Sequence, residues 1–237
     1  MEKMYEKVLV EVDRGKNFWQ VALEHLRVTL EFETEQLSKV PQSGPVIFIA
    51  NHPFGVLDGL SICYLASQVR PDFRIFIHSA LCREERLRPY LLPVDFDETE
   101  EAVRTNIESK RQALEILQNG GTIIIFPAGG ISMSDGLVGE ATDLEWKLFV
   151  TKLIQMSRAT VVPIYFHGQN SWAFQWFSQI SIALRASLVL HEVRNKMGDT
   201  IRISIGEPIP YTELAGIKKR KQLLQHLRTI TYSLACG

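Results

Sequence analysis

The sequence predicts one α/β domain with a mostly parallel central sheet and helices on both faces of that sheet. After residue 44, short apolar runs alternate with longer stretches of helical periodicity, as in chains that join parallel strands through crossover helices. The chain has 237 residues, 46% of them hydrophobic and 22% charged, which is enough for such a domain with a substantial core.

The strands are expected where apolar runs are short, and the helices where the longer periodic stretches lie. The predicted strands are 45–50, 73–78, 91–96, 122–126, 160–166 and 200–206. The predicted helices are 58–69, about 80–89, 98–118, 143–157, 172–190 and 212–234. Residues 1–40 are predicted to form a helical segment that precedes the main domain at 41–237.

Charge and cysteine content narrow the classes of partner and cofactor. The formal net charge of −1 argues against nucleic acid as a partner. Cys63, Cys82 and Cys236 are far apart and lack metal-ligand spacing, which fits a reducing compartment without disulfide bonds. We expect no metal and no bound cofactor. Since no run of about 18 apolar residues occurs, we expect no transmembrane helix, and a cytoplasmic protein that is soluble or attached to a membrane surface.

Polar and glycine residues recur at the carboxyl ends of the first five predicted strands, which is where ligands bind in open α/β sheets. We expect the loops there to hold the site. Its candidate residues, in chain order, are Asn51, His52, Phe54, Gly55, Asp58, His78, Asp95, Pro127, Ala128, Gly129, Gly130, Ser132 and His167.

Among these candidates, His52 and Asp58 are the pair that most directly indicates catalysis. A neutral imidazole can take a proton from a hydroxyl group, and a nearby carboxylate can orient the ring and stabilise the imidazolium. Gly55 allows the sharp turn that would bring the two together. The alternative is that Asp58 only caps the following helix and that His52 is an ordinary polar loop residue.

Two other features carry weaker signals. Gly129 and Gly130 can turn backbone N–H groups toward an oxyanion, or they can form a plain turn. The stretch 171–190 is rich in aromatic residues and almost free of charge, which suits either a helix at a lipid–water interface or a buried core helix.

Three blocks resemble motifs of the glycerolipid (PlsC-like) acyltransferases. NHPFGVLD, FPAGGIS and VVPIYFHG are similar to the motifs NHx4D, FPEGTRS and VPI of that family, in order and in strand–loop context, over about residues 40 to 210. The chain most resembles the hemolysin-like, or lyso-ornithine-lipid acyltransferase, branch. The resemblance implies a glycerolipid acyltransferase-like fold and transfer of a fatty acyl group to a lipid hydroxyl.

The resemblance also implies roles. His52 becomes the general base and Asp58 its partner, the acyl donor is a thioester of acyl carrier protein or coenzyme A, and no acyl-enzyme is required. The acceptor is a lysolipid at a membrane surface, which places the protein on the inner face of the membrane. Backbone N–H groups near Gly129 and Gly130 would bind the oxyanion or the acceptor.

The departures from the motifs bear on the acceptor. Five residues separate His52 from Asp58 where the family has four, Ala128 replaces a Glu, and Ile131 replaces an Arg. Acidic residues, among them Asp95, Asp97 and Glu98, follow the third strand, where the family places a phosphate-binding Arg. We therefore expect lysophosphatidate to be a poor acceptor and a lyso-aminolipid a better one, unless Arg83, Arg86 or Arg88 supplies the missing charge.

Two other functions remain open from the sequence. The altered FPAGGIS block also fits a catalytically lapsed relative that binds lipid or acyl carrier protein. The same histidine could instead activate water and hydrolyse a thioester.

Overall fold

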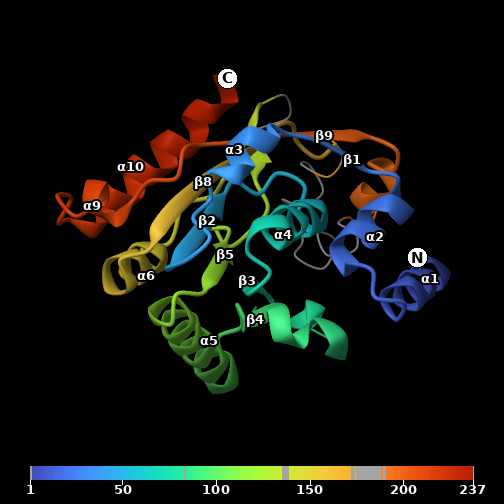
Figure 1. Ribbon diagram of the computed structural model, residues 1–237, viewed down its shortest axis with the longest axis horizontal. Helices are drawn as coiled ribbons and strands as arrows, with labels where there is room; N and C mark the ends of the chain where they lie inside the picture. Colours follow the sequence, from blue (N-terminus) through green and yellow to red (C-terminus); the bar gives the residue numbers. More distant parts are fainter. Residues whose placement is uncertain are drawn as a thin grey trace.

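The protein is described here from a computed structural model that covers residues 2–82, 84–134, 139–171 and 191–236, with residues 174 and 188. A seven-stranded sheet runs in the order β1-β9-β8-β2-β5-β3-β4 (Figure 1). All neighbouring strands pair in parallel except β8 and β9, which are antiparallel. The predicted α/β fold with a mostly parallel sheet is confirmed.

The strands of this sheet are β1 (Thr29–Glu31), β2 (Val46–Ala50), β3 (Phe73–His78), β4 (Leu91–Val94), β5 (Thr122–Ile125), β8 (Thr160–Phe166) and β9 (Thr200–Ile205). A separate hairpin consists of β6 (Met133–Ser134) and β7 (Ala141–Thr142). The helices are α1 (Glu2–Val12), α2 (Phe18–Leu26), α3 (Thr34–Ser38), α4 (Val56–Val69), α5 (Glu100–Gln118), α6 (Phe149–Ser157), α9 (Tyr211–Leu214) and α10 (Arg220–Ser233).

Strand β2 lies at the centre of the sheet and shows how the two faces are built. All five of its residues are buried, as expected for a parallel strand covered on both faces. Val46, Phe48 and Ala50 pack into the core that includes α2 and α4, whereas Ile47 and Ile49 point the other way, into the core of α5, α6, α9 and α10. Figure 1 shows these two groups of helices on opposite sides of the sheet.

Several predicted elements differ from the observed ones. Residues 29–31 of the expected helical segment form β1, which extends the sheet by pairing with β9. In place of a helix at about 80–89 there are two 3₁₀ helices, η1 (Ser79–Leu81) and η2 (Glu85–Tyr90). The side chains of His78 and Glu84 each accept a backbone N–H there, so the chain restarts rather than continuing as one helix.

The remaining helix differences also have local causes. The helix predicted at 143–157 begins only at Phe149, because the residues before it bind the loops of the sheet edge: the N–H of Lys147, for example, donates to the carbonyl of Pro127. The stretch predicted as one helix at 212–234 is divided into α9 and α10. The aromatic stretch 171–190 lies almost entirely outside the described residues, so both interpretations of it remain predictions.

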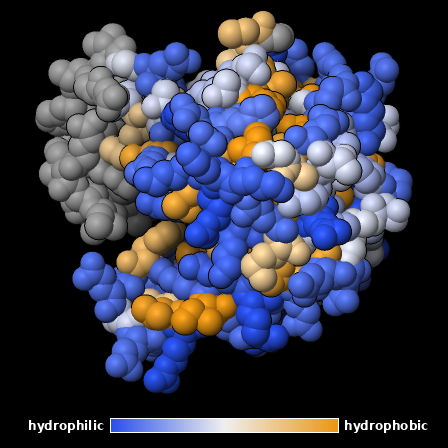
Figure 2. All heavy atoms as spheres, turned by 90° about the vertical axis from the view of Figure 1, so that its left-hand side faces the viewer, coloured by the Kyte–Doolittle hydropathy of each residue, from blue (hydrophilic) through white to orange (hydrophobic). Residues whose placement is uncertain are grey.

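The surface over α6, α9 and α10 is mostly hydrophilic, with hydrophobic side chains showing in separate places (Figure 2). Across the described parts of the chain, no helix is both long and apolar enough to cross a membrane.

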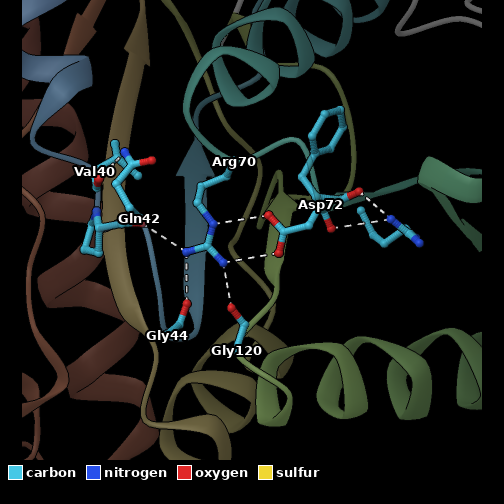
Figure 3. A network of polar contacts seen from close by, with 9 residues as sticks. Val40, Gln42, Gly44, Arg70, Asp72 and Gly120 are labelled. Carbon is cyan, nitrogen blue, oxygen red and sulfur yellow. Dashed lines mark hydrogen bonds and ion pairs between the residues drawn. The ribbon is translucent and has the colours of Figure 1, made fainter.

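Arg70, which is 4% exposed, stabilises the edge of the sheet at which the parallel strands begin. Its guanidinium donates to the carbonyls of Pro41 and Gly44, before β2, and to the carbonyl of Gly120, before β5 (Figure 3). It also pairs with Asp72, before β3. One planar guanidinium group therefore joins the loops that lead into the neighbouring strands β2, β5 and β3.

Replacing Arg70 by alanine should lower the free energy of unfolding by about 3 kcal/mol, because three backbone carbonyls lose a charged donor in a buried place. Denaturant unfolding of the variant measures this. Asp72→Asn is the matched control: Asp72 has a side chain 49% exposed, and its loss leaves the carbonyl contacts of Arg70 in place, so a smaller loss is expected. An Arg70→Ala protein as stable as Asp72→Asn would contradict this account.

Candidate active site

Five strands run in the same direction and bring their carboxyl ends to one edge of the sheet. These strands are β8, β2, β5, β3 and β4, which are neighbours in that order. The loops that follow them carry the residues selected from the sequence. The edge is therefore the place where an open α/β sheet binds its ligands.

Asn51 ends the β2–β8 ladder with its side chain. Its Nδ2 donates to the carbonyl of Phe166 at 2.9 Å, and its Oδ1 accepts the N–H of Phe166 at 2.7 Å. The side-chain amide thus takes the place of a backbone peptide in the ladder. The main chain is free to leave the sheet at this residue and to carry His52 out over the edge.

His52 and Asp58 meet although the motif is one residue longer than the family pattern. The distance from Nδ1 of His52 to Oδ2 of Asp58 is 3.0 Å. Gly55 has a φ of 75°, a conformation that glycine adopts without strain, and it turns the chain into α4 just before Asp58. The contact has hydrogen-bond length but poor alignment, and such contacts in catalytic sites often tighten when substrate binds.

Asp58 is both a helix cap and the partner of His52. It is fully buried, and its Oδ2 also accepts the N–H groups of Phe54 and Gly55 at 2.8 and 2.9 Å, so this side chain in the first turn caps the start of α4. Burial raises the pKa of Asp58, while the donors from His52, Phe54 and Gly55 oppose that rise. The two interpretations of Asp58 drawn from the sequence are therefore compatible.

The imidazole of His52 is held from a second side by an aromatic ring. It stacks on Phe126, at the end of β5, with ring centroids 3.9 Å apart and an angle of 23° between the planes. Its side chain remains 17% exposed. Because Nδ1 faces the carboxylate, Nε2 is the nitrogen left to accept a proton from a ligand.

The FPAGGIS block forms a turn that is tied to His52. The N–H of Ser132 donates to the carbonyl of His52 at 2.8 Å. Gly129 has a φ of 71°, and its own N–H donates to the carbonyl of Phe126. Within the part of the chain that is described, the N–H groups of Gly130 and Ile131 have no hydrogen-bond acceptor. Pro127 and Ala128 are buried beneath the turn.

His78 and Asp95 lie together at the ends of β3 and β4. The carboxylate of Asp95 accepts hydrogen bonds from the Asp97 N–H and the Ser79 hydroxyl, which lower the pKa of Asp95. The ring of His78 lies 5.5 Å from that of Phe96. A Cβ added to Gly129 would lie 3.5 Å from the same Phe96 ring, so these loops adjoin the FPAGGIS turn.

His167 and Phe54 lie on the β8 side of the edge. The ring of His167 is 2.7 Å from the hydroxyl of Ser204 on β9, and burial, followed by the charge of Arg202, lowers the pKa of His167. Phe54 is buried and packs against Gly168, and the ammonium of Lys196 lies 5.5 Å from its ring centroid. A cation is therefore present on this side of the site.

One residue at the edge was missed by the sequence analysis. Asp143, which follows β7, is 5% exposed, and its carboxylate accepts hydrogen bonds from both Ser132 and the main chain of His52. A single aspartate without a second charged residue at a diagnostic spacing gives no sequence signal. Only the fold places it beside the NHPFGVLD loop.

Comparison with known proteins places this geometry in a family. A family model described as "Acyltransferase" matches residues 10–236. A lyso-glycine lipid O-acyltransferase of Phocaeicola vulgatus is 32% identical over 232 residues, which span 93% of this chain and 78% of that protein. A second protein of that name, from Bacteroides thetaiotaomicron, is 28% identical over 231 residues, spanning 93% and 80%.

A solved structure supports the fold. The 1-acyl-sn-glycerophosphate (LPA) acyltransferase PlsC from Thermotoga maritima superposes with a TM-score of 0.52 and 18% sequence identity, covering 98% of this chain and 86% of that one. Because the family model spans nearly the whole sequence, the chain belongs to the acyltransferase family, and its fold is similar to that of PlsC.

Proposed function

We propose that the protein transfers a fatty acyl group from a thioester of acyl carrier protein or coenzyme A to the hydroxyl group of a lysolipid, with His52 as general base. The observation that carries this proposal is the 3.0 Å contact between Nδ1 of a half-buried His52 and the fully buried carboxylate of Asp58, at the ligand-binding edge of the sheet. Membership of the acyltransferase family supplies the reaction class.

In the proposed reaction, Nε2 of His52 takes the proton of the acceptor hydroxyl as its oxygen attacks the thioester carbonyl carbon. Asp58 holds the ring by Nδ1 and stabilises the positive charge that the ring then carries. When the tetrahedral intermediate collapses, the C–S bond breaks, the thiolate leaves and the imidazolium returns the proton to it. One acyl group is transferred and no acyl-enzyme forms.

The oxyanion of the intermediate needs donors close to His52. The N–H groups of Gly130 and Ile131 are suited to that role, because the Ser132–His52 hydrogen bond holds their turn against the catalytic loop and neither N–H has an acceptor within the described residues. We assign the oxyanion to this turn rather than to the N–H of Gly129, which donates to Phe126.

We further propose an amino-acid-containing lysolipid, such as a lyso-glycine lipid, as the acceptor. Two relatives carry that name. The cations that the phosphate-binding family motifs use are absent here, with Ile131 in place of an Arg and Asp95 at the end of β4. Arg83, which could supply a cation, lies outside the described residues. Arg86 and Arg88 are exposed on the surface, where Arg86 pairs with Asp13 and Arg88 lies 3.8 Å from Glu85.

A lysolipid acceptor also indicates where in the cell the protein acts. Lysolipids with long acyl chains lie in or at a bilayer, so we propose that the sheet edge works at a membrane surface, on its cytoplasmic face.

Replacing His52 by alanine should lower kcat for acyl transfer by about 10²–10⁴-fold, the usual contribution of a general base. The measurement is transfer of a labelled acyl group to a lysolipid, with products separated as acylated lipid and free fatty acid. Wild-type protein that releases only free fatty acid would be a thioester hydrolase. Wild-type protein that forms neither product while binding lipid would be a lapsed relative.

Two substitutions at Asp58 should separate its roles. Asp58→Asn keeps an acceptor for the Phe54 and Gly55 N–H groups and puts its NH₂ where Oδ1 receives no hydrogen bond, so it removes the charge and keeps the helix cap. We expect kcat to fall by about 10²-fold or more with little loss of stability. Asp58→Ala removes the cap as well and should cost about 1–3 kcal/mol in denaturant unfolding. Full activity in Asp58→Asn would reduce Asp58 to a helix cap.

The acceptor proposal predicts an order of substrates. With one acyl donor, kcat/KM should be higher for a lyso-glycine lipid than for lysophosphatidate, because a phosphate without arginine partners loses charge-assisted hydrogen bonds of about 1.5–3 kcal/mol each. A lyso-ornithine lipid, which carries an additional amine, tests whether Asp95 favours a cation. Preference for lysophosphatidate would contradict the proposal without affecting the assignment of His52.

A further inference from the structure

We propose that Asp143 is a positioning residue that holds the catalytic loop and the oxyanion turn at a fixed separation; the inference rests on the proposed function of His52. The basis is a set of hydrogen bonds that converge on one buried carboxylate. Oδ1 accepts the N–H of His52 at 3.0 Å and the hydroxyl of Ser132 at 2.6 Å, and Oδ2 accepts the indole N–H of Trp146 at 2.7 Å.

The donors to Asp143 are all neutral. Its carboxylate forms no ion pair with any of the described residues, and the hydrogen bond that Arg228 donates to Asp143 goes to the backbone carbonyl, at 3.4 Å. A carboxylate group that is 5% exposed and has no cation beside it is stabilised mainly by the hydrogen bonds that it accepts. Removing the carboxylate group therefore affects all three donors at once.

Two buried carboxylates together bind every backbone N–H of the loop at residues 52–55. Pro53 has no N–H. The N–H of His52 goes to Asp143, and those of Phe54 and Gly55 go to Asp58. His52 thus lies between the two acids: its imidazole faces Asp58, and its main chain is held by Asp143. A loop whose donors are all bound to charged acceptors has little freedom to move.

Asp143 also reaches the turn that carries the oxyanion donors. The Ser132 hydroxyl donates to the same oxygen as the His52 N–H, and the Ser132 N–H donates to the carbonyl of His52. Ser132 and His52 are therefore joined both directly and through Asp143. This closed arrangement fixes how far the imidazole lies from the N–H groups of Gly130 and Ile131.

Asp143 is itself held from the outside. Its N–H donates to the hydroxyl of Tyr232 on α10 at 2.8 Å, and Trp146, three residues later, is 3% exposed. Burial, and then the charge of Asp143, raise the pKa of Tyr232 to about 12, so its hydroxyl stays protonated across the working range of pH. Asp143 thus connects the candidate active site to helix α10.

The test is Asp143→Asn, which keeps one acceptor oxygen but sets an NH₂ group against one of the three donors. We expect kcat to fall by about 10- to 100-fold, the effect of misplacing a catalytic group by a fraction of an ångström to one ångström, with KM for donor and acceptor unchanged. Hydrogen exchange at the His52 N–H should quicken by about tenfold or more, because it loses a charged acceptor.

Glu192→Gln is the matched control. Glu192 is 2% exposed and also receives three neutral donors on two oxygens, from the N–H and hydroxyl of Ser171 and from Asn195, but among the described residues it forms no hydrogen bond or ion pair with the NHPFGVLD loop. We expect it to leave kcat and the exchange of the His52 N–H at their wild-type values. Equal losses of kcat in both variants would overturn the proposal, since they would reflect a general cost of altering a buried acid.

Ser132→Ala covers the case in which Asp143→Asn does not fold. It removes one donor from Oδ1 and should lower kcat by a smaller factor at constant KM. A rise in KM at constant kcat would overturn the proposal, because it would place the Ser132 hydroxyl on the substrate. The hydrogen-exchange measurement does not depend on catalysis. Slow exchange of the His52 N–H in the wild type and fast exchange in Asp143→Asn would therefore support the positioning role of Asp143 even if His52 proved not to be the base.

Discussion

A carboxylate in a protein interior keeps its charge only where N–H or O–H groups point at it, and this requirement shapes the active edge. Asp58 has no exposed surface, and the loop before α4 folds back so that two backbone N–H groups and one imidazole nitrogen surround one of its oxygens. The same contacts that make the buried charge tolerable also begin the helix and orient the base. Stability and chemistry thus share one set of contacts at this point.

The parallel sheet brings the loops of the site together. Parallel pairing of β8, β2, β5, β3 and β4 sends all their following loops to one edge, so residues more than a hundred positions apart in the chain can share a site. The opposite edge is used differently. There Arg70 joins the loops entering β2, β3 and β5 without any part in the proposed reaction. Structural support and ligand binding are therefore divided between the two edges.

Much of this could be predicted from sequence, because the signals were local. The apolar runs at 73–78 and 160–166 have the same bounds as β3 and β8, and the histidine, the aspartate and the glycine pair stand at strand ends. What escaped prediction depends on tertiary contacts. The three residues of β1 form a strand only because β9 offers an edge, and residues 143–148 have helical periodicity but bind His52, Ser132 and Pro127 instead.

The side chain of Asn51 has a consequence for how the motif can vary in length. Since it replaces a peptide unit in the β2–β8 ladder, the residue at which the chain leaves the sheet is fixed by covalent geometry: aspartate lacks the donor, and glutamine is one carbon too long. An inserted residue can be accommodated only downstream, where Pro53 and Gly55 shape the turn. This loop can therefore accept an inserted residue after Asn51 but not before it. For that reason His52 and Asp58 still meet although five residues separate them.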